Sequence, residues 1–236
     1  MIFLKADWEN LIMANYTINP YVLLPFLPKG VEIDTYQGKA YVSLVGFMFK
    51  NTRLFNIPIP YLGTFEEINL RFYVKRKEGN EWKRGVVFIN ETIPYKPVAW
   101  MANWLYKEHY ISIPTKHKWS FQEKTKDIRY DWKLGNKWNV LTVNAANKKQ
   151  PMAKGSIEEY IFEHYFGYTK VDDNTTQEYN VAHPRWETNQ ITDYHIDCDF
   201  GAMYGEAFRF LNHQEPANVI MAEGSEVTVD WKRTTI

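Results

Sequence analysis

Residues 64–74, with the sequence TFEEINLRFYV, restrict the fold of this chain more than any other stretch. Side chains alternate across a β-strand, so these residues separate into two rows. One row is apolar and contains Ile68, Leu70, Phe72 and Val74, and the other contains Glu67, Asn69, Arg71 and Tyr73. The polar row fits either the solvated face of an antiparallel sheet, which is the commoner arrangement, or the lining of a cavity inside a curved or closed sheet.

The chain has 236 residues, of which 45% are hydrophobic and 17% aromatic, enough for a sizeable core. That length suits one large β-rich domain or two small ones. Because no linker, low-complexity tract or internal repeat is visible, we predict a single domain over residues 1–236. Lys and Arg together number 28, as do Asp and Glu, and no long run of one sign occurs. This charge pattern argues against nucleic acid as a partner.

The sequence indicates neither secretion nor a membrane span. The N-terminus lacks a basic region followed by a long apolar stretch, and no apolar run approaches the length that crosses a bilayer. Cys198 is the single cysteine, which excludes an internal disulfide and a multi-thiolate metal site. We therefore expect a soluble, cytoplasmic protein.

Strands outnumber helices in the predicted secondary structure. Residues 31–36 and 39–49 are predicted to form a hairpin, whose second strand is buried on both faces. Prolines at alternate positions make residues 53–60 a rim loop. Further strands are expected near residues 85–90, 116–124, 127–134, 137–143, 177–182 and 188–199, with a final pair through Val219 and residues 227–229.

Helices are predicted at four places. Asn19 and Pro20 begin a short helix over residues 21–27, and apolar spacing indicates another over residues 97–106. Ser156 and Glu159 form a capping box for a helix over residues 156–166 that ends at Gly167. A short helix is expected near residues 202–211. The predicted fold class is α+β, predominantly antiparallel β, and is compatible with sheet closure.

Several short motifs occur in the order seen in one protein family. They are Trp8, Pro20, residues 27–32 (LPKGVE), 38–42 (GKAYV), 65–71 (FEEINLR), 155–158 (GSIE) and 183–186 (HPRW). In this respect the chain resembles the YqjF-like family, a branch of the acetoacetate decarboxylase-like superfamily, over most of its length. The resemblance implies a large, curved or closed sheet around a central cavity, with a few flanking helices. It also implies that Glu67, Asn69 and Arg71 face inward, so it favours the cavity lining.

The resemblance does not extend to the reaction of acetoacetate decarboxylase. That enzyme forms a Schiff base through a lysine whose pKa is lowered by desolvation and by an adjacent lysine. In this chain the positions of that lysine pair fall on Tyr110 and Ile111. Lys107 lies three residues away beside Glu108, whose negative charge would favour the protonated amine and oppose its nucleophilicity. We therefore predict no Schiff-base lysine and no cofactor.

The polar row and Tyr110 form the candidate site that this resemblance implies. Arg71 would bind the carboxylate of an anionic substrate, Asn69 would orient it, and Glu67 would transfer a proton if burial brings its pKa toward neutrality. Tyr110 would donate a hydrogen bond in the pocket. The structural alternative is an internal ion pair between Glu67 and Arg71, which a ligand can open.

Other polar residues have simpler explanations. Residues 183–186 (HPRW) favour packing, and Ser112 lacks the motif that surrounds a hydrolase nucleophile. His195, Asp197 and Asp199 alternate along one strand face, which fits either ligands of a divalent metal ion or an exposed edge strand. The edge strand is the commoner arrangement, so we predict no metal site there. Cys198 is expected to be a small buried hydrophobe. Seven tryptophans either line an apolar pocket or fill the core: Trp82, Trp100, Trp104, Trp119, Trp132, Trp138 and Trp186.

Together these features predict a protein that binds a small organic anion in a central cavity. If it is an enzyme, the expected class is a lyase or isomerase that acts near a carbonyl group without a Schiff base. One alternative is a non-catalytic binding or sensing module, and another is a purely structural interaction protein without a cavity. Because relatives in the superfamily tend to assemble, the resemblance also suggests a homo-oligomer.

Overall fold

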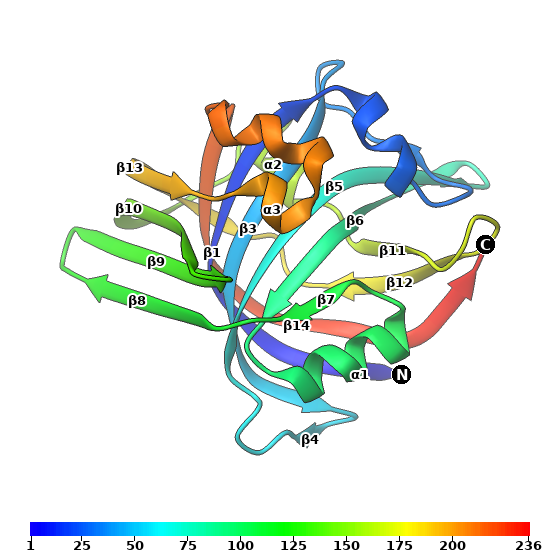
Figure 1. The fold of residues 1–236 in the computed structure, drawn as a ribbon, viewed down its shortest axis with the longest axis horizontal. Coiled ribbons are helices and arrows are strands. Elements are labelled where there is room, and N and C mark those ends of the chain that lie inside the picture. Colours follow the sequence, from blue (N-terminus) through cyan, green and yellow to red (C-terminus); the bar gives the residue numbers. More distant parts are fainter.

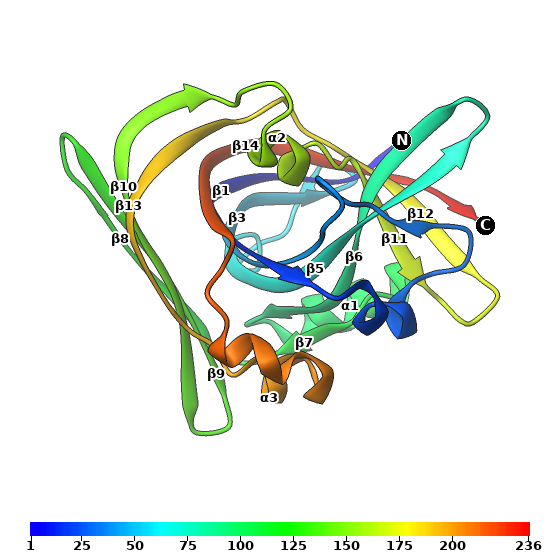
Figure 2. The same ribbon diagram turned by 90° about the horizontal axis from the view of Figure 1, so that it is seen from above.

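Seven strands close into a ring in the computed structural model, which describes residues 1–236 apart from the side chain of Lys232 (Figures 1 and 2). In order around the ring they are β1 (Ile2–Ile18), β3 (Ala40–Leu54), β5 (Phe65–Glu78), β6 (Glu81–Ile93), β11 (Phe166–Lys170), β12 (Thr176–Ala182) and β14 (Asn218–Thr235). Pairing of β14 with β1 closes the ring. Neighbours in the ring are antiparallel except β6 and β11, which are parallel.

Four further strands extend the sheet from β14 into an arm (Figure 2). From the ring outward they are β13 (Glu187–Asp197), β10 (Lys137–Pro151), β9 (Thr125–Leu134) and β8 (Thr115–Phe121). The short strands β2 (Glu32–Ile33), β4 (Ile57–Pro58) and β7 (Tyr110–Ser112) pair with β5, β3 and β6 respectively. The α+β class with mostly antiparallel strands is thus confirmed.

Few helices accompany the sheet. They are α1 (Lys96–Tyr106), α2 (Ile157–Phe162) and α3 (Phe200–Tyr204), with 3-10 turns at Pro20–Val22, Leu24–Phe26 and Glu206–His213. The helix predicted over residues 97–106 corresponds to α1. Within the described part of the chain, no helix has the length and apolar character needed to cross a membrane.

Strand β5 is buried on both faces. Ile68, Leu70 and Phe72 belong to one apolar cluster together with residues of β9 and β10 from the arm. Phe65 and Tyr73, on the opposite face of the same strand, belong to a second cluster inside the ring. The neighbouring β3 is likewise buried throughout residues 40–49, which confirms the prediction made from its continuous apolar sequence.

The two longest strands, β1 and β14, are not apparent from local sequence patterns. In β1, Asn10 has a φ of 53° and the register with β3 shifts beside it, which interrupts the alternation of side chains. In β14, Gly224 has a φ of 85°, and a Cβ there would lie 1.9 Å from the carbonyl oxygen of Trp8, so only glycine fits. The predicted final pair of strands is therefore wrong, because residues 218–235 form one strand that passes through this glycine.

Strand pairing also overrides three other local predictions. The hairpin predicted for residues 31–36 and 39–49 is reduced to one antiparallel bridge between Tyr36 and Lys39. Its longer strand pairing is wrong, because β1 and β5 occupy the two edges of β3 and Glu32–Ile33 pairs with β5 instead. The helix predicted over residues 156–166 ends at Phe162, since Gly167 lies within β11 opposite Tyr179. The short helix predicted over residues 21–27 is a pair of 3-10 turns. The helix predicted near residues 202–211 is divided into the five-residue α3 and a following 3-10 turn.

Candidate functional site

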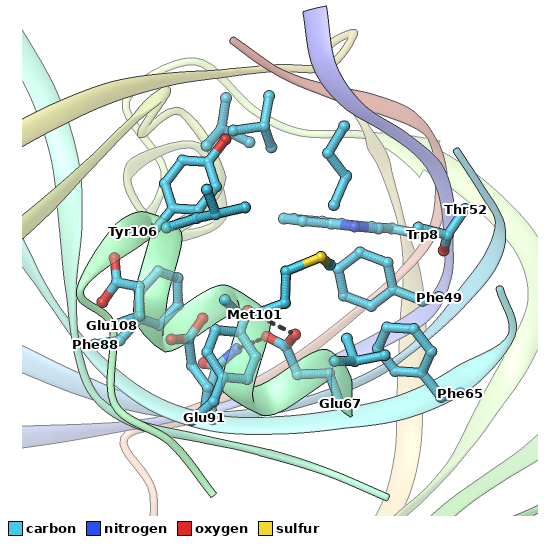
Figure 3. A pocket seen from close by; sticks show the side chains of 18 of the residues that line it. Trp8, Phe49, Thr52, Phe65, Glu67, Phe88, Glu91, Met101, Tyr106 and Glu108 are labelled. Carbon is cyan, nitrogen blue, oxygen red and sulfur yellow. Dashed lines mark hydrogen bonds between the residues drawn. The ribbon is translucent and has the colours of Figure 1, made fainter. Parts of the chain in front are cut away.

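A cavity of about 110 Å³ lies inside the ring, with α1 on one side of it (Figure 3). Its walls come from β1, β3, β5, β6, β12 and β14, together with α1 and the segment that follows α1. Apolar side chains predominate in the lining. The polar lining residues are Thr52, Glu67, Asn69, Arg71, Glu91 and Glu108, with Tyr106, Tyr110 and Tyr179.

The polar row of β5 lines this cavity. Glu67, Asn69 and Arg71 all face it from β5, and Tyr110 faces it from β7. Glu67 is 3% exposed and Arg71 is 9% exposed, so the row is not a solvated face. The structure thus brings the four residues singled out from the sequence together around one enclosed space.

The carboxyl group of Glu67 is buried and accepts two hydrogen bonds. Asn69 Nδ2 donates to its Oε1 at 3.0 Å, and the Tyr110 hydroxyl donates to its Oε2 at 3.3 Å. Burial raises the pKa of Glu67 to about 7, although these two hydrogen bonds and the positive charge of Arg71 act in the opposite direction. Glu67 therefore changes its protonation state near neutral pH.

Two more buried glutamates, Glu91 and Glu108, lie in the same cavity. Burial and then repulsion from Glu108 and Glu67 raise the pKa of Glu91 well above its ordinary value. Burial also raises the pKa of Glu108 to about 7, although its carboxyl group accepts hydrogen bonds from Thr169 and from Tyr179, the latter at 2.8 Å. The cavity therefore holds three carboxyl groups whose pKa values are raised by burial.

These two glutamates were missed in the sequence. In the sequence, Glu91 could have been noticed because it lies at the end of an apolar strand. In the structure, the register of β5 and β6 places it opposite Asn69. In the sequence, Glu108 was considered only for the effect of its charge on the neighbouring Lys107. Lys107 has a φ of 58° and ends α1, so its side chain is exposed while Glu108 is buried.

Arg71 is a buried guanidinium group without a carboxylate partner. No Asp or Glu oxygen of the described residues lies within the 4.0 Å that defines an ion pair with it. Its Nη2 contacts the sulfur of Met13 at 3.5 Å, and its Nε has no hydrogen-bond partner within the described structure. The direct Glu67–Arg71 ion pair considered from the sequence is therefore not formed, although the two charges attract across a longer distance.

The cavity lining does not contain a lysine among the described residues. Tyr110 stands where the resemblance puts the reactive lysine pair, and it contributes a hydroxyl group instead of an amine. An amine nucleophile for a Schiff base is thus missing from this lining.

The remaining candidates have structural roles. His183 stacks on Trp186, with ring centroids 3.9 Å apart, in agreement with the packing interpretation. Asp197 pairs with Lys137 at 2.8 Å and Asp199 caps α3, and in the described part of the chain no group of three or more His, Cys, Asp or Glu residues is arranged to hold a metal ion. Ser112 donates to the Pro94 carbonyl, and Cys198 is buried.

None of the seven tryptophans considered from the sequence lines the cavity. Trp132 and Trp186 are buried, whereas Trp100 and Trp104 are 70% and 62% exposed on the outer face of α1. The aromatic lining comes instead from Trp8, from phenylalanines of β1, β3, β5 and β6, and from the three tyrosines named above.

Comparison with known protein families and sequences gives two matches. The model of the family described as an uncharacterised conserved protein, DUF2071, matches residues 5–226. The uncharacterised protein YqjF of Bacillus subtilis (strain 168) is 33% identical over 88 residues, which are 37% of this chain and 35% of that protein. The matched stretch therefore spans about a third of this relative's length.

Solved structures with a similar fold cover almost all of the chain. An acetoacetate decarboxylase-like enzyme from Sphingomonas wittichii RW1 has a TM-score of 0.67 at 10% identity, over 100% of this chain and 94% of that one. Acetoacetate decarboxylase from Legionella pneumophila has a TM-score of 0.66 at 12% identity, over 99% and 87%. The enduracididine biosynthesis enzyme MppR complexed with pyruvate has a TM-score of 0.63 at 10% identity, over 100% and 91%. At these identities the likeness concerns the fold, and it confirms the acetoacetate decarboxylase-like architecture expected from the sequence.

Proposed function

We propose that this chain, which belongs to the DUF2071 family of uncharacterised conserved proteins, binds a small organic acid in its central cavity and transfers a proton at the carbon beside a carbonyl group. The observation that carries the proposal is the buried guanidinium group of Arg71, which has no carboxylate partner in the described chain. In this proposal the carboxylate of the ligand is that partner.

The charges of the cavity support an anionic ligand. A buried cation without a counter-ion is costly, and the planar guanidinium group suits two-pronged binding of a carboxylate. Because burial raises the pKa values of Glu67, Glu91 and Glu108, these groups are less ionised near neutral pH than ordinary glutamates and oppose the approach of a ligand carboxylate less. Asn69 Oδ1 is buried without a partner in the described structure and is available to a donor group of the ligand.

Glu67 is the proposed proton carrier. A carboxyl group with a pKa of about 7 accepts and returns protons near neutral pH, as a general acid-base group must. The proton moves from the carbon atom of the ligand to the Glu67 carboxylate, and the electron pair shifts toward the neighbouring carbonyl oxygen. Tyr110 stabilises the charged form of Glu67 through its hydrogen bond. This chemistry belongs to the lyase or isomerase class and needs no Schiff base.

Two structures of one fold neighbour, MppR, accord with an oxo acid as the ligand. MppR is described in complex with pyruvate, and also with a condensation product of pyruvate and imidazole 4-carboxaldehyde. Pyruvate carries a carboxylate beside a carbonyl group, the combination that Arg71 and Glu67 would serve. We therefore propose an oxo acid as the ligand of this chain, without proposing that the chain catalyses the reaction of MppR.

The binding part of the proposal is tested by thermal denaturation with a panel of small carboxylic and oxo acids. A ligand at about a hundred times its Kd adds roughly 2.7 kcal/mol to the free energy of unfolding, and each kcal/mol raises Tm by about 2–4 °C in a chain of this size. We expect at least one acid to stabilise the wild type and the control Arg53→Met, whose arginine is exposed on β3. Arg71→Met should not respond, and an equal response of both variants would contradict the proposal.

The catalytic part is tested by hydrogen exchange at the ligand. We expect the wild type in D2O to exchange the hydrogen beside the carbonyl group of a bound oxo acid, as followed by proton NMR. Glu67→Gln should slow this exchange by about 10²–10⁴-fold while the ligand still stabilises the variant. Stoichiometric binding without exchange in the wild type would instead identify a non-catalytic binding or sensing module.

A further inference from the structure

The cavity has a polar and an apolar end, and strand register sets this polarity. The inward residues of β5 are Phe65, Glu67, Asn69 and Arg71, and the β3 residues opposite them are Phe49, Phe47, Val45 and Ser43. Six residues of strand span about 20 Å, so the backbone positions of Phe65 and Arg71 lie far apart. In β1, Trp8 stands opposite Phe49 and extends the aromatic end.

Aromatic rings surround the apolar end, where Figure 3 shows Trp8, Phe49 and Phe65 close together. Phe49 and Phe65 are stacked with centroids 4.9 Å apart, and the ring of Trp8 lies 5.6 Å from Phe49. The indole N–H of Trp8 and the hydroxyl of Thr52 are buried there without a hydrogen-bond partner in the described structure. Walls of this kind bind a flat ring through stacked and edge-to-face contacts.

We infer that the ligand is an aryl-substituted carboxylic acid, with its carboxylate on Arg71 and its ring beside Trp8, Phe49 and Phe65. The inference rests on the proposed function and adds the chemical class of the apolar part of the ligand. The cavity volume of about 110 Å³ is of the same order as that of an engineered apolar cavity of about 150 Å³ that binds benzene. A single six-membered ring is therefore the largest apolar group that we expect the cavity to hold, and a ring hydroxyl would satisfy the polar atoms of Trp8 and Thr52.

Matched pairs of acids test this inference by calorimetric titration of the wild type. One pair is pyruvate and phenylpyruvate, and the other is propionate and 3-phenylpropionate. Burial of a phenyl group in the aromatic end should lower the Kd of the phenyl acid by about 10- to 100-fold relative to its partner. The comparison within each pair keeps the carboxylate constant, so it isolates the contribution of the ring.

A constricting variant locates the ring. Val98 lines the cavity from α1 and belongs to the same apolar cluster as Phe49 and Phe65. Val98→Phe should raise the Kd of the phenyl acids by about tenfold or more and leave pyruvate almost unaffected, because overfilling excludes only the larger group. Val31→Phe is the matched control, since Val31 is half-buried and lies outside the lining.

The outcomes separate this inference from the proposed function. Equal affinity of the wild type for both members of each pair would overturn the inference and leave acid binding intact. An equal loss of affinity for both members in Val98→Phe would have the same meaning. Failure of every acid to bind the wild type overturns both. If Val98→Phe does not fold, the wild-type pairs decide the question by themselves.

Discussion

The Tyr110 hydroxyl donates a hydrogen bond to Oε2 of Glu67 across 3.3 Å. Tyr110 comes from β7, where it pairs with Glu91 of β6, and Glu67 comes from β5. The contact therefore joins two segments of the chain at the position where the resemblance puts a reactive lysine. The uncharged Tyr110 hydroxyl thus lies beside a carboxyl group whose pKa burial raises to about 7.

Tyr110→Phe should raise the pKa of Glu67 above its value of about 7, because the lost hydrogen bond favours the charged carboxylate. We expect a shift of about one pH unit, the size that a hydrogen bond to a charged group implies. NMR titration of carbon-labelled glutamate carboxyl groups measures it. Tyr21→Phe is the control, since Tyr21 is exposed, and an unchanged titration in Tyr110→Phe would show that the contact does not act on Glu67.

Arg71→Met should stabilise the protein in the absence of ligand. The substitution replaces a buried charge that has no carboxylate partner with an apolar side chain of similar length, which removes the cost of keeping that charge away from water. Denaturant unfolding measures the difference, with Arg53→Met expected within about 0.5 kcal/mol of the wild type. Strong destabilisation of Arg71→Met would indicate that Arg71 holds the fold together.

The contribution of Glu67 to stability should fall as the pH rises from about 4.5 to about 7. Glu67 keeps its proton to about pH 7 in the folded chain, and its ordinary value is 4.5. Between these values the unfolded chain has released the proton and the folded chain has not, so rising pH favours unfolding. Each such carboxyl group contributes at most about 1.4 kcal/mol per pH unit, and Glu108 acts in the same direction.

Urea unfolding across this pH range tests the dependence. Relative to the wild type, Glu67→Gln should lose this fall in stability with rising pH, because glutamine does not titrate. Glu81→Gln, at an exposed position of β6, should keep the wild-type slope. A slope in Glu67→Gln as steep as that of the wild type would place the titration elsewhere.

Gly224→Ala should destabilise the protein by more than about 3 kcal/mol, since a Cβ at this position would meet the Trp8 carbonyl oxygen at 1.9 Å in addition to the strained φ of 85°. The matched control is Gly38→Ala, where φ is 75° and no atom lies within 4 Å. There we expect a loss of about 1 kcal/mol from the backbone alone. Thermal unfolding compares the two, and equal losses would mean that the close approach of β1 and β14 is not what requires glycine.

Local pattern in the sequence was sufficient for several elements. The alternation in residues 67–73 put Glu67, Asn69 and Arg71 on one face of a strand, and the continuous apolar run of residues 40–49 indicated a strand buried on both faces. The apolar spacing of residues 97–106 predicted α1. These features depend on neighbours within a few residues, so the sequence by itself determines them.

The local pattern of β5 does not determine which of its faces meets the cavity or which other residues line that cavity. Alternation separates the side chains of β5 into two rows, but it does not determine which row faces the inside of the ring. That depends on ring closure by the pairing of β1 with β14, in which Asn15 lies opposite Asn218, a residue near the other end of the chain. Glu91 and Glu108 join Glu67 only through the pairing of separate segments, and their raised pKa values arise from that shared burial. Long-range strand pairing has no local signature, which is why the residues of the polar row were identifiable in advance and the cluster of three carboxyl groups was not.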